Sequence, residues 1–232
     1  MRTHGKHKLH KEKYMRTKVL LCAAALAASL ASSMAQNVYS LNVVGYYNIT
    51  VPASGFYMIA NQLNTTNNTL DSLLPSVADG SQLYKYAGGY SAYAYDATIP
   101  GWTTTGITLN PGEAAFFRDT VGGSGQVLTF VGEVLQNTSP GLVNTLPIGN
   151  SIRASMVPQQ GTATGDLGVP GEDGDQMYVY NGGYAAYAYD ITIPGWTSTD
   201  PAGPIINVGQ GFFYKKLAGG VSTSWVRSFT VQ

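Results

Sequence analysis

Cysteine and histidine are nearly absent from this sequence of 232 residues, which contains one cysteine and three histidines. All four lie within the first 35 residues, as Cys22, His4, His7 and His10. If those residues form a leader that is removed, the rest of the chain has no thiol and no imidazole. It then cannot form a disulfide, a zinc or copper imidazole site, a Ser-His-Asp or Cys-His nucleophile, or an imidazole general base. We therefore predict a protein without a cofactor.

Basic side chains are also scarce after residue 35. The whole chain balances 13 Lys and Arg against 13 Asp and Glu, but seven of the basic residues lie in residues 1–35. The remaining 197 residues carry six basic and twelve acidic side chains, a formal charge of −6. Binding to a phosphate backbone requires a basic face, so nucleic acid is not an expected partner.

A secretory leader is indicated at the N-terminus. The basic run is followed by the apolar stretch 19–30 and then by Ser33-Met34-Ala35, the small-x-small pattern of a signal-peptide cleavage site. The apolar stretch is too short to span a bilayer comfortably, although a short anchor helix is the alternative interpretation. We predict a signal peptide over residues 1–35, with Met15 as an alternative start. The mature chain would have no membrane span and would be periplasmic, extracellular or at the cell surface.

A long internal repeat dominates the rest of the sequence. Residues 84–102, YKYAGGYSAYAYDATIPGW, return ninety-four positions later as residues 178–196, YVYNGGYAAYAYDITIPGW. Fifteen of the nineteen paired positions are identical, which indicates a tandem duplication. Short strand patterns separated by Gly, Pro and Asn turns predict an all-β fold. We predict two tandem homologous small β-sandwich or β-barrel modules, at residues 36–134 and 135–232.

The repeated stretch has the pattern of a β-hairpin. Its tyrosines alternate with other residues at the period of two that is typical of strands. The pairs Gly88-Gly89 and Gly182-Gly183 interrupt the alternation and predict turns, because glycine adopts positive φ without a steric penalty. Tyr90 is out of phase with Tyr93 and Tyr95, so we expect at least one row of tyrosines to be exposed.

Several segments together resemble a group of uncharacterised secreted tandem-repeat β-proteins that are abundant in the Verrucomicrobia and related phyla. These segments are AQNVYSLNVVGYYNITVPASGFYMIANQL, DGSQLYKY and DGDQMYVY, GGYSAYAYD with its tryptophan turn, and NPGEAAFF or VGQGFFYKK. The resemblance covers essentially all of the mature chain. It implies an exported bacterial β-repeat protein and assigns no chemistry.

The repeated aromatic residues form the candidate binding surface. An exposed row of tyrosines that ends in a tryptophan can stack on sugar rings or anchor a protein contact, whereas inward-facing rows are core. The candidate residues are Tyr90, Tyr93, Tyr95, Trp102, Tyr184, Tyr187, Tyr189 and Trp196. We predict an exported, non-enzymatic protein that acts in binding or adhesion, with a polysaccharide or a protein at the cell surface as its partner.

Two other functions are compatible with the sequence. A glycoside hydrolase needs two carboxyl groups at a defined separation, and Glu113 with Asp96 is the candidate catalytic pair. The repeat partner of Glu113 is Gln210, so that site would occur once in the chain. Asp96 also fits a structural role, because its position beside a turn suits an Asx turn. The second alternative is a self-associating structural subunit of a surface layer or filament.

A weak calcium-binding pattern occurs in the second repeat. Glu172, Asp173 and Asp175 place three carboxylates around a glycine, and hard cations prefer such oxygen ligands. The twelve-residue loop pattern of a helix-loop-helix calcium site is absent, which favours a solvated turn.

Overall fold

The computed structural model describes residues 43–232 except 100, 121–122, 124, 218–222 and 232. The predicted signal peptide, with Met15, therefore lies outside the described residues. Residues 42–232 form one compact unit. The predicted division between residues 134 and 135 stays a prediction, and we use "N-terminal half" for strands β1 to β7 and "C-terminal half" for strands β8 to β16.

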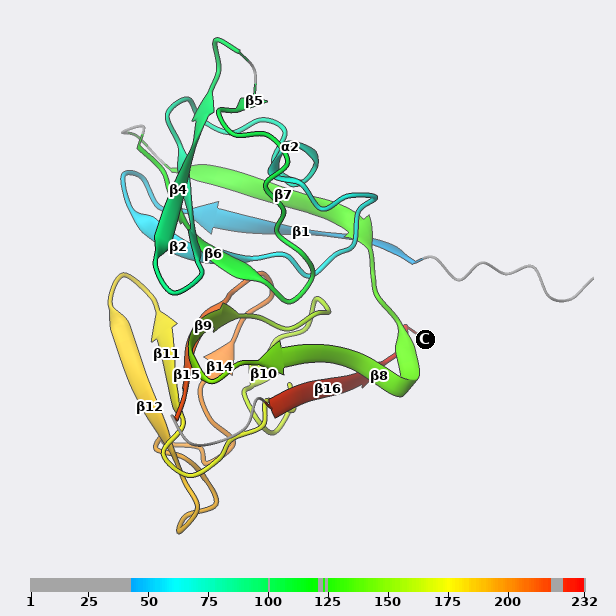
Figure 1. Cartoon of the computed structure of the whole chain (residues 1–232), viewed down its shortest axis with the longest axis vertical. Coiled ribbons are helices and arrows are strands. Elements are labelled where there is room, and N and C mark those ends of the chain that lie inside the picture. The colour runs from blue at the N-terminus through cyan, green and yellow to red at the C-terminus, as the bar shows by residue number, and fades with distance from the viewer. Residues whose placement is uncertain (1–42, 100, 121–122, 124, 218–222, 232) are drawn as a thin grey trace, which may run out of the picture. The chain divides into compact units, whose positions relative to one another are not determined.

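The described chain is nearly all β-structure, which confirms the predicted fold class (Figure 1). The N-terminal half contains β1 (Val44–Val51), β2 (Phe56–Ala60), β3 (Gln82–Tyr86), β4 (Tyr90–Asp96), β5 (Gly101–Trp102), β6 (Ala114–Arg118) and β7 (Gln126–Glu133), with one turn of α-helix, α2 (Leu70–Leu73), between β2 and β3. The C-terminal half contains β8 (Asn137–Leu146), β9 (Gly149–Arg153), β10 (Gly161–Thr162), β11 (Gln176–Tyr180), β12 (Tyr184–Asp190), β13 (Gly195–Trp196), β14 (Ile205–Ile206), β15 (Phe212–Lys216) and β16 (Thr223–Phe229). Among the described residues, no helix is long and apolar enough to cross a lipid bilayer.

The two halves have the same strand order. In the N-terminal half, a five-stranded sheet has the order β2-β6-β3-β4-β5, and β1 pairs with β7. In the C-terminal half, the corresponding order is β9-β15-β11-β12-β13, and β8 pairs with β16. The short pair β10 and β14 of the C-terminal half has only a single antiparallel bridge, between Thr69 and Thr108, as its counterpart in the described part of the N-terminal half. The strands pair antiparallel throughout the described chain.

Both predicted hairpins are present. Tyr86 pairs with Tyr90 at the end of the β3-β4 hairpin, and Tyr180 pairs with Tyr184 at the end of the β11-β12 hairpin. Gly88 and Gly182, the first glycine of each turn, both have φ of +79°. This left-handed conformation explains why glycine occupies the position in both copies.

Each five-stranded sheet packs one of its faces against the two-stranded sheet of its own half. In the N-terminal half, Leu83 and Phe117 lie in one core cluster with Tyr47 of β1 and Phe130 of β7. The rings of Tyr47 and Phe130 are stacked, with centroids 5.1 Å apart. A second cluster in the C-terminal half unites β8, β11, β15 and β16 through the residues Leu146, Met177, Val179, Phe212, Tyr214 and Trp225. Apolar area removed from water stabilises by roughly 25 cal/mol per Å², so these two clusters are the main source of stability in each half.

The opposite faces of the two five-stranded sheets meet each other. A third core cluster contains Met58, Ala60, Ala114 and Phe116 from the N-terminal half together with Ile152 and Ala154 from the C-terminal half. The backbone contacts across it are reciprocal. The amide of Ala60 donates to the carbonyl of Gly209 (2.8 Å), and the amide of Ala154 donates to the carbonyl of Gly112 (2.9 Å).

These four residues are equivalent in pairs, since Ala154 follows Ala60 by 94 positions and Gly209 follows Gly112 by 97. Such reciprocity is the defining feature of an isologous interface, in which the same surface patch is used on both sides. Gly112 and Gly209 lie in tight turns, with φ of +88° and +72°. Each half therefore projects a turn against the sheet of the other half.

Candidate binding site

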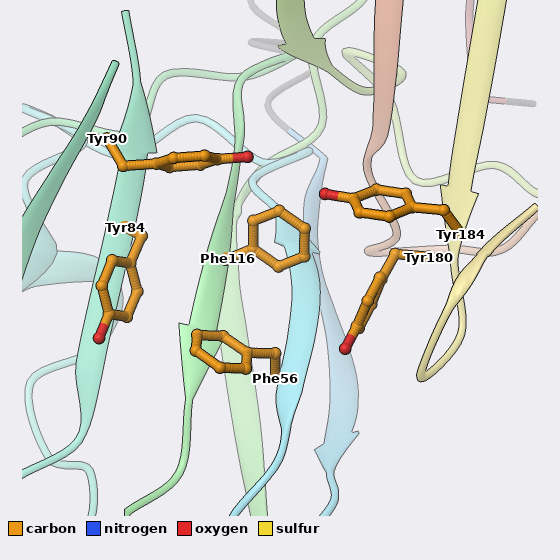
Figure 2. Close-up of a pocket in the computed structure, with 6 residues that line it drawn as sticks. All are labelled: Phe56, Tyr84, Tyr90, Phe116, Tyr180 and Tyr184. Carbon is orange, nitrogen blue, oxygen red and sulfur yellow. The ribbon is translucent and has the colours of Figure 1, made fainter.

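An aromatic cleft, here called cleft A, lies where the two halves meet. It has a volume of about 390 Å³ and is lined by six rings, those of Phe56, Tyr84, Tyr90, Phe116, Tyr180 and Tyr184 (Figure 2). Four of these rings come from the N-terminal half and two from the C-terminal half. Cleft A thus depends on both copies of the repeated hairpin.

The pleat of the strands decides which tyrosines reach the cleft. Tyr86 and Tyr90 are directly paired, and Tyr84 lies two residues before Tyr86, so all three project from one face of the sheet. Phe116 of β6 is the register partner of Tyr84 and shares that face. Tyr93 pairs with the core residue Leu83 and projects from the opposite face. The phase difference within β4 therefore separates interface tyrosines from core tyrosines.

Phe116 is the central ring of the cleft. Its centroid lies 5.2 Å from that of Tyr180, 6.1 Å from that of Tyr90 and 6.3 Å from that of Tyr184. The contacts with Tyr180 and Tyr184 are edge-to-face, with interplanar angles of 88° and 89°. Edge-to-face pairs are worth about 0.5–1.5 kcal/mol each beyond the area they bury, so these contacts hold the cleft walls in place.

Tyr90 and Tyr184 are equivalent residues of the repeat and remain the most exposed rings of the cleft, at 50% and 54%. Figure 2 shows their hydroxyl groups directed toward each other from opposite sides of Phe116. Burial, and then the neighbouring Tyr184, raise the pKa of Tyr90 above its ordinary value of 10.0. Its phenol is therefore neutral at physiological pH and can donate or accept a hydrogen bond.

A second cleft, here called cleft B, occupies the equivalent position in the C-terminal half. It has a volume of about 430 Å³ and is lined by Tyr90, Asn150, Tyr178, Tyr184, Phe213 and Lys215. Tyr178 and Phe213 are the repeat equivalents of Tyr84 and Phe116, and Asn150 is the equivalent of Phe56. Tyr90 and Tyr184 line both clefts. Because they are equivalent residues of the repeat, each takes in cleft B the position that the other takes in cleft A.

Six of the eight predicted binding residues line neither cleft. Tyr95, Trp102 and Trp196 are buried in the core clusters, and Tyr93, Tyr187 and Tyr189 are partly buried and pack against those clusters. Trp102 and Trp196 are 2% and 0% exposed, so neither ring has a free face for a ligand. Of the predicted residues, only Tyr90 and Tyr184 line the clefts.

The tryptophans are buried because the Ile-Pro-Gly-Trp turn folds back onto its own strand. Trp102 pairs with Tyr95, and Trp196 pairs with Tyr189. Both indole nitrogens are satisfied internally: Nε1 of Trp102 donates to the carbonyl of Leu74 (3.1 Å), and that of Trp196 to the hydroxyl of Thr164 (2.9 Å).

The remaining cleft residues were missed by the sequence reasoning. Tyr84 projects from the same face of its hairpin as Tyr90, and Tyr178 and Tyr180 project from the same face as Tyr184. The period-two spacing of these tyrosines in the sequence indicates the shared face. Phe56, Phe116, Asn150, Phe213 and Lys215 come from other strands, and only sheet pairing brings them to the clefts.

Glu113 and Asp96 lie far apart and do not form a catalytic carboxylate pair. Glu113 forms an ion pair with Lys85 (3.2 Å), beside the end of the hairpin where Tyr86 pairs with Tyr90. Asp96 lies at the other end of β4, about 20 Å from Tyr90 at a rise of about 3.3 Å per residue. Retaining and inverting glycosidases need separations of at most about 10 Å.

Asp96 instead stabilises the turn that follows β4. Its carboxylate accepts hydrogen bonds from the amide of Thr98 (2.8 Å) and from the Thr98 hydroxyl (2.6 Å). These two bonds lower the pKa of Asp96, with the hydroxyl as the larger cause. Asp190 and Thr192 repeat the arrangement at 2.7 Å and 2.6 Å, so the predicted Asx turn is present in both copies.

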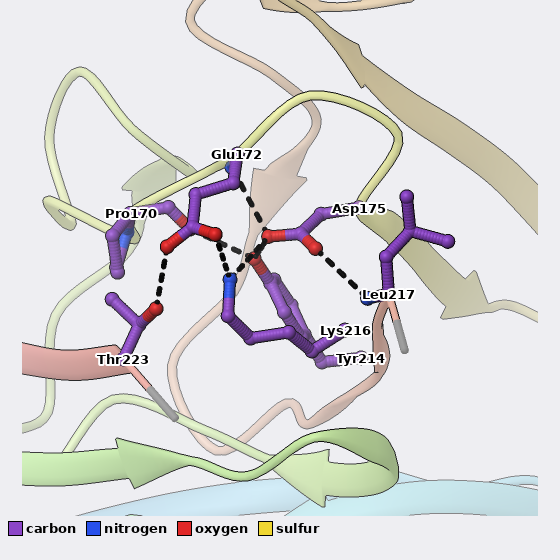
Figure 3. A network of polar contacts seen from close by, with 7 residues as sticks. All are labelled: Pro170, Glu172, Asp175, Tyr214, Lys216, Leu217 and Thr223. Atoms are coloured by element: carbon purple, nitrogen blue, oxygen red, sulfur yellow. Dashed lines mark hydrogen bonds and ion pairs between the residues drawn. The ribbon is translucent and has the colours of Figure 1, made fainter. Parts of the chain in front are cut away.

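Two of the three predicted calcium ligands, Glu172 and Asp175, bind a lysine of the same chain. The Lys216 ammonium lies 2.9 Å from Glu172 Oε2 and 3.1 Å from Asp175 Oδ2 (Figure 3). The hydroxyl of Tyr214 also donates to Asp175 (2.7 Å), and Asp173 accepts a hydrogen bond from a backbone amide. The lysine thus occupies the place that a cation would take. Among the described residues, no group of three or more His, Cys, Asp or Glu side chains is arranged to hold a metal ion.

The electrostatics of this cluster favour its charged form. Burial would lower the pKa of Lys216, but hydrogen bonds to Glu172 and Asp175 outweigh burial and raise it. The hydrogen bond from Lys216, followed by that from Thr223, lowers the pKa of Glu172. Burial, followed by the hydrogen bond to Asp175, raises the pKa of Tyr214.

No protein-family model, curated protein or solved structure matches this chain. The resemblance to secreted bacterial repeat proteins consequently stays an expectation from the sequence.

Proposed function

We propose that this protein is an exported, non-enzymatic binding protein that holds a glycan at the bacterial cell surface through clefts A and B. The observation that carries the proposal is cleft A, in which six aromatic rings surround about 390 Å³. That volume falls within the roughly 300–1,000 Å³ of small-ligand pockets, which are mostly apolar with a few polar groups that fix orientation.

The chemistry of cleft A matches that of a sugar ring. A pyranose has an apolar face of C–H groups, which packs on the electron-rich face of an aromatic ring. Its hydroxyls need donors and acceptors, which the phenols of Tyr90 and Tyr184 can supply. The rings of these two tyrosines are half exposed, so an incoming ligand can reach them.

A binding assay with a panel of insoluble polysaccharides tests the proposal. The protein from residue 36 onward is incubated with each polymer, bound protein is measured, and the supernatants are assayed for released reducing sugar. Binding without release is the expected result. Release of reducing sugar would show a hydrolase instead, and binding to no polymer would overturn the proposal.

Variants locate the site once a ligand is found. Tyr90→Ala should weaken binding by about tenfold or more, because aromatic anchors dominate binding energies. Tyr46→Ala is the matched control, since Tyr46 is 74% exposed on β1 and lines neither cleft. Equal losses in both variants would place the binding surface elsewhere.

A self-associating structural subunit is the second candidate function. One face of the β1-β7 pair exposes a row of apolar side chains, namely Val44, Tyr46, Val127 and Val131, which are 54–74% exposed. Exposed apolar patches of this kind mark interaction sites, and a second copy of the chain is the proposed occupant. Light scattering at increasing concentration distinguishes the two: growth in mass that Tyr46→Asp abolishes supports the subunit, and a stable monomer excludes it.

A further inference from the structure

One cross-strand pair differs between the two clefts. In the N-terminal half, Phe56 of β2 pairs with Arg118 of β6. In the C-terminal half, the equivalent pair is Asn150 of β9 with Lys215 of β15. The exchange replaces a ring by an amide and a guanidinium by an ammonium at the same position of the sheet.

This difference gives the two cationic side chains, Arg118 and Lys215, different neighbours. The guanidinium carbon of Arg118 lies 5.4 Å from the centroid of the Phe56 ring, a cation–π contact. Lys215 has no ring at the equivalent position, because Asn150 stands there. The ammonium of Lys215 therefore remains available to a ligand, whereas Arg118 is held by its neighbour.

No internal anion neutralises Lys215 within the described part of the chain. The ion pairs there involve Lys85 and Lys216, and the other residues that line cleft B carry no carboxylate. Lys215 is partly exposed and makes no side-chain hydrogen bond to another described residue. A cation at the wall of a cleft, without a counter-ion, favours a ligand that brings its own negative charge.

The rest of the lining indicates the kind of anion. Phe213, Tyr178 and the two shared tyrosines supply aromatic faces for a ring, as their equivalents do in cleft A. Lys215 and Asn150 stand side by side on neighbouring strands and together offer an ammonium and an amide N–H₂. A carboxylate accepts hydrogen bonds from both groups, and charge-assisted bonds are roughly twice as strong as neutral ones.

We propose that cleft B binds a sugar that carries a carboxylate, a uronic acid, whereas cleft A binds a neutral sugar. This inference rests on the proposed function and divides it between the two clefts. A glycan with both kinds of residue would occupy both clefts at once, with Tyr90 and Tyr184 between them.

The test compares two forms of one saccharide by titration calorimetry with the purified protein. Oligogalacturonate carries carboxylates, and its methyl ester has the same backbone without the charge. We expect the acid form to bind about tenfold more tightly than the ester at low salt, and we expect this preference to shrink in about 0.5 M salt, because salt screens partly exposed charges.

Three variants assign the preference to cleft B. Lys215→Met removes the charge and retains the apolar stem, so the acid form should then bind no better than the ester. Asn150→Phe gives cleft B the ring of cleft A and should also shift binding toward the ester. Arg118→Met is the matched control at the equivalent strand position and should leave the preference intact.

The outcomes separate this inference from the proposed function. Equal affinity for the acid and the ester, or a preference that survives in Lys215→Met, overturns the assignment of cleft B while glycan binding stands. Failure of the acid, the ester and every neutral oligosaccharide to bind overturns the proposed function itself. Circular dichroism checks that each variant is folded; if Lys215→Met is misfolded, the Asn150→Phe variant decides.

Discussion

Replacing Lys216 by methionine tests the polar network of the C-terminal half. The side chains of Lys216 and Asp175 are each 1% exposed, so the substitution leaves a buried carboxylate without its counter-ion. Removing one partner of a buried pair costs about 3–5 kcal/mol. The Tyr214 hydroxyl and two backbone amides still donate to Asp175, which places the expected loss near the lower end, about 3 kcal/mol.

Urea unfolding followed by tryptophan fluorescence measures this loss. The ring of Trp196 lies 6.1 Å from that of Tyr214, so the probe is close to the network. In a chain of this size, a loss of about 3 kcal/mol corresponds to a decrease in Tm of about 6–12 °C. Lys215→Met is the matched control, because the neighbouring lysine is partly exposed and has no ion pair among the described residues; it should change stability by at most about 0.5 kcal/mol.

The same network makes stability depend on pH at both extremes. The raised pKa of Lys216 means that its stabilisation is complete below the ordinary lysine value of 10.5 and is lost as the pH rises through the higher folded value. The lowered pKa of Glu172 means that its stabilisation is present above the ordinary value of 4.5 and is lost as the pH falls through the lower folded value. Lys216→Met should flatten both limbs of the profile.

Two results would refute this reasoning. A loss below about 1 kcal/mol in Lys216→Met would mean that the network behaves as an exposed surface ion pair, for which such values are typical. A double variant, Lys216→Met with Asp175→Asn, should lose less than the sum of the two single losses, since the groups are in contact. Strict additivity would show that they do not interact.

Three further predictions concern the interface and the repeated turn. Phe116→Ala should cost about 3–5 kcal/mol in urea unfolding, as expected for a buried ring, and a loss under about 1 kcal/mol would contradict its central position. Gly209→Ala should destabilise more than Gly88→Ala: the φ angles are similar at +72° and +79°, but an added Cβ at Gly209 meets side chains at 2.8 Å and one at Gly88 meets nothing within 4 Å. Because Gly88 has open space around it, the loss in Gly88→Ala measures the backbone penalty alone, about 1–2 kcal/mol. Equal losses of stability in the two variants would show that Gly209 is not closely packed. Thr98→Val should raise the pKa of Asp96 toward its ordinary value in an NMR titration, whereas an unchanged pKa would rule out the hydroxyl as the main cause.

The strands and turns of this fold were largely predictable because local rules decide them. Gly88 in the turn after Tyr86 has positive φ, and the alternation on either side favours strands, so the β3-β4 hairpin follows from a few adjacent residues. The two faces of the hairpin were also predictable from the phase of Tyr90 relative to Tyr93. The partner of each face was not predictable, because period-two alternation shows that a strand has two faces without showing what packs against either one.

The location of the clefts depends on contacts between residues that are distant in sequence. Phe116 meets Tyr180 and Tyr184 only because the two halves pack face to face, and no local pattern encodes that packing. The burial of Trp102 has a related cause, because the pairing of β5 with β4 turns its ring into the core. The ion pairs of Lys216 with Glu172 and Asp175 are equally non-local, since more than forty residues separate the lysine from both acids.

The reciprocal interface between the two halves has an evolutionary consequence. Two identical chains that met through such an interface would form a symmetric dimer, and every substitution would appear on both sides of the axis. The internal sequence repeat predicts that the two halves descend from one such chain, and joining them in a single chain would remove that constraint, since each half could then mutate alone. Phe56 and Asn150 occupy equivalent positions yet differ, while Tyr90 and Tyr184, which serve both clefts, are the same residue. On that prediction, fusion would let one symmetric contact diverge into two clefts with different linings.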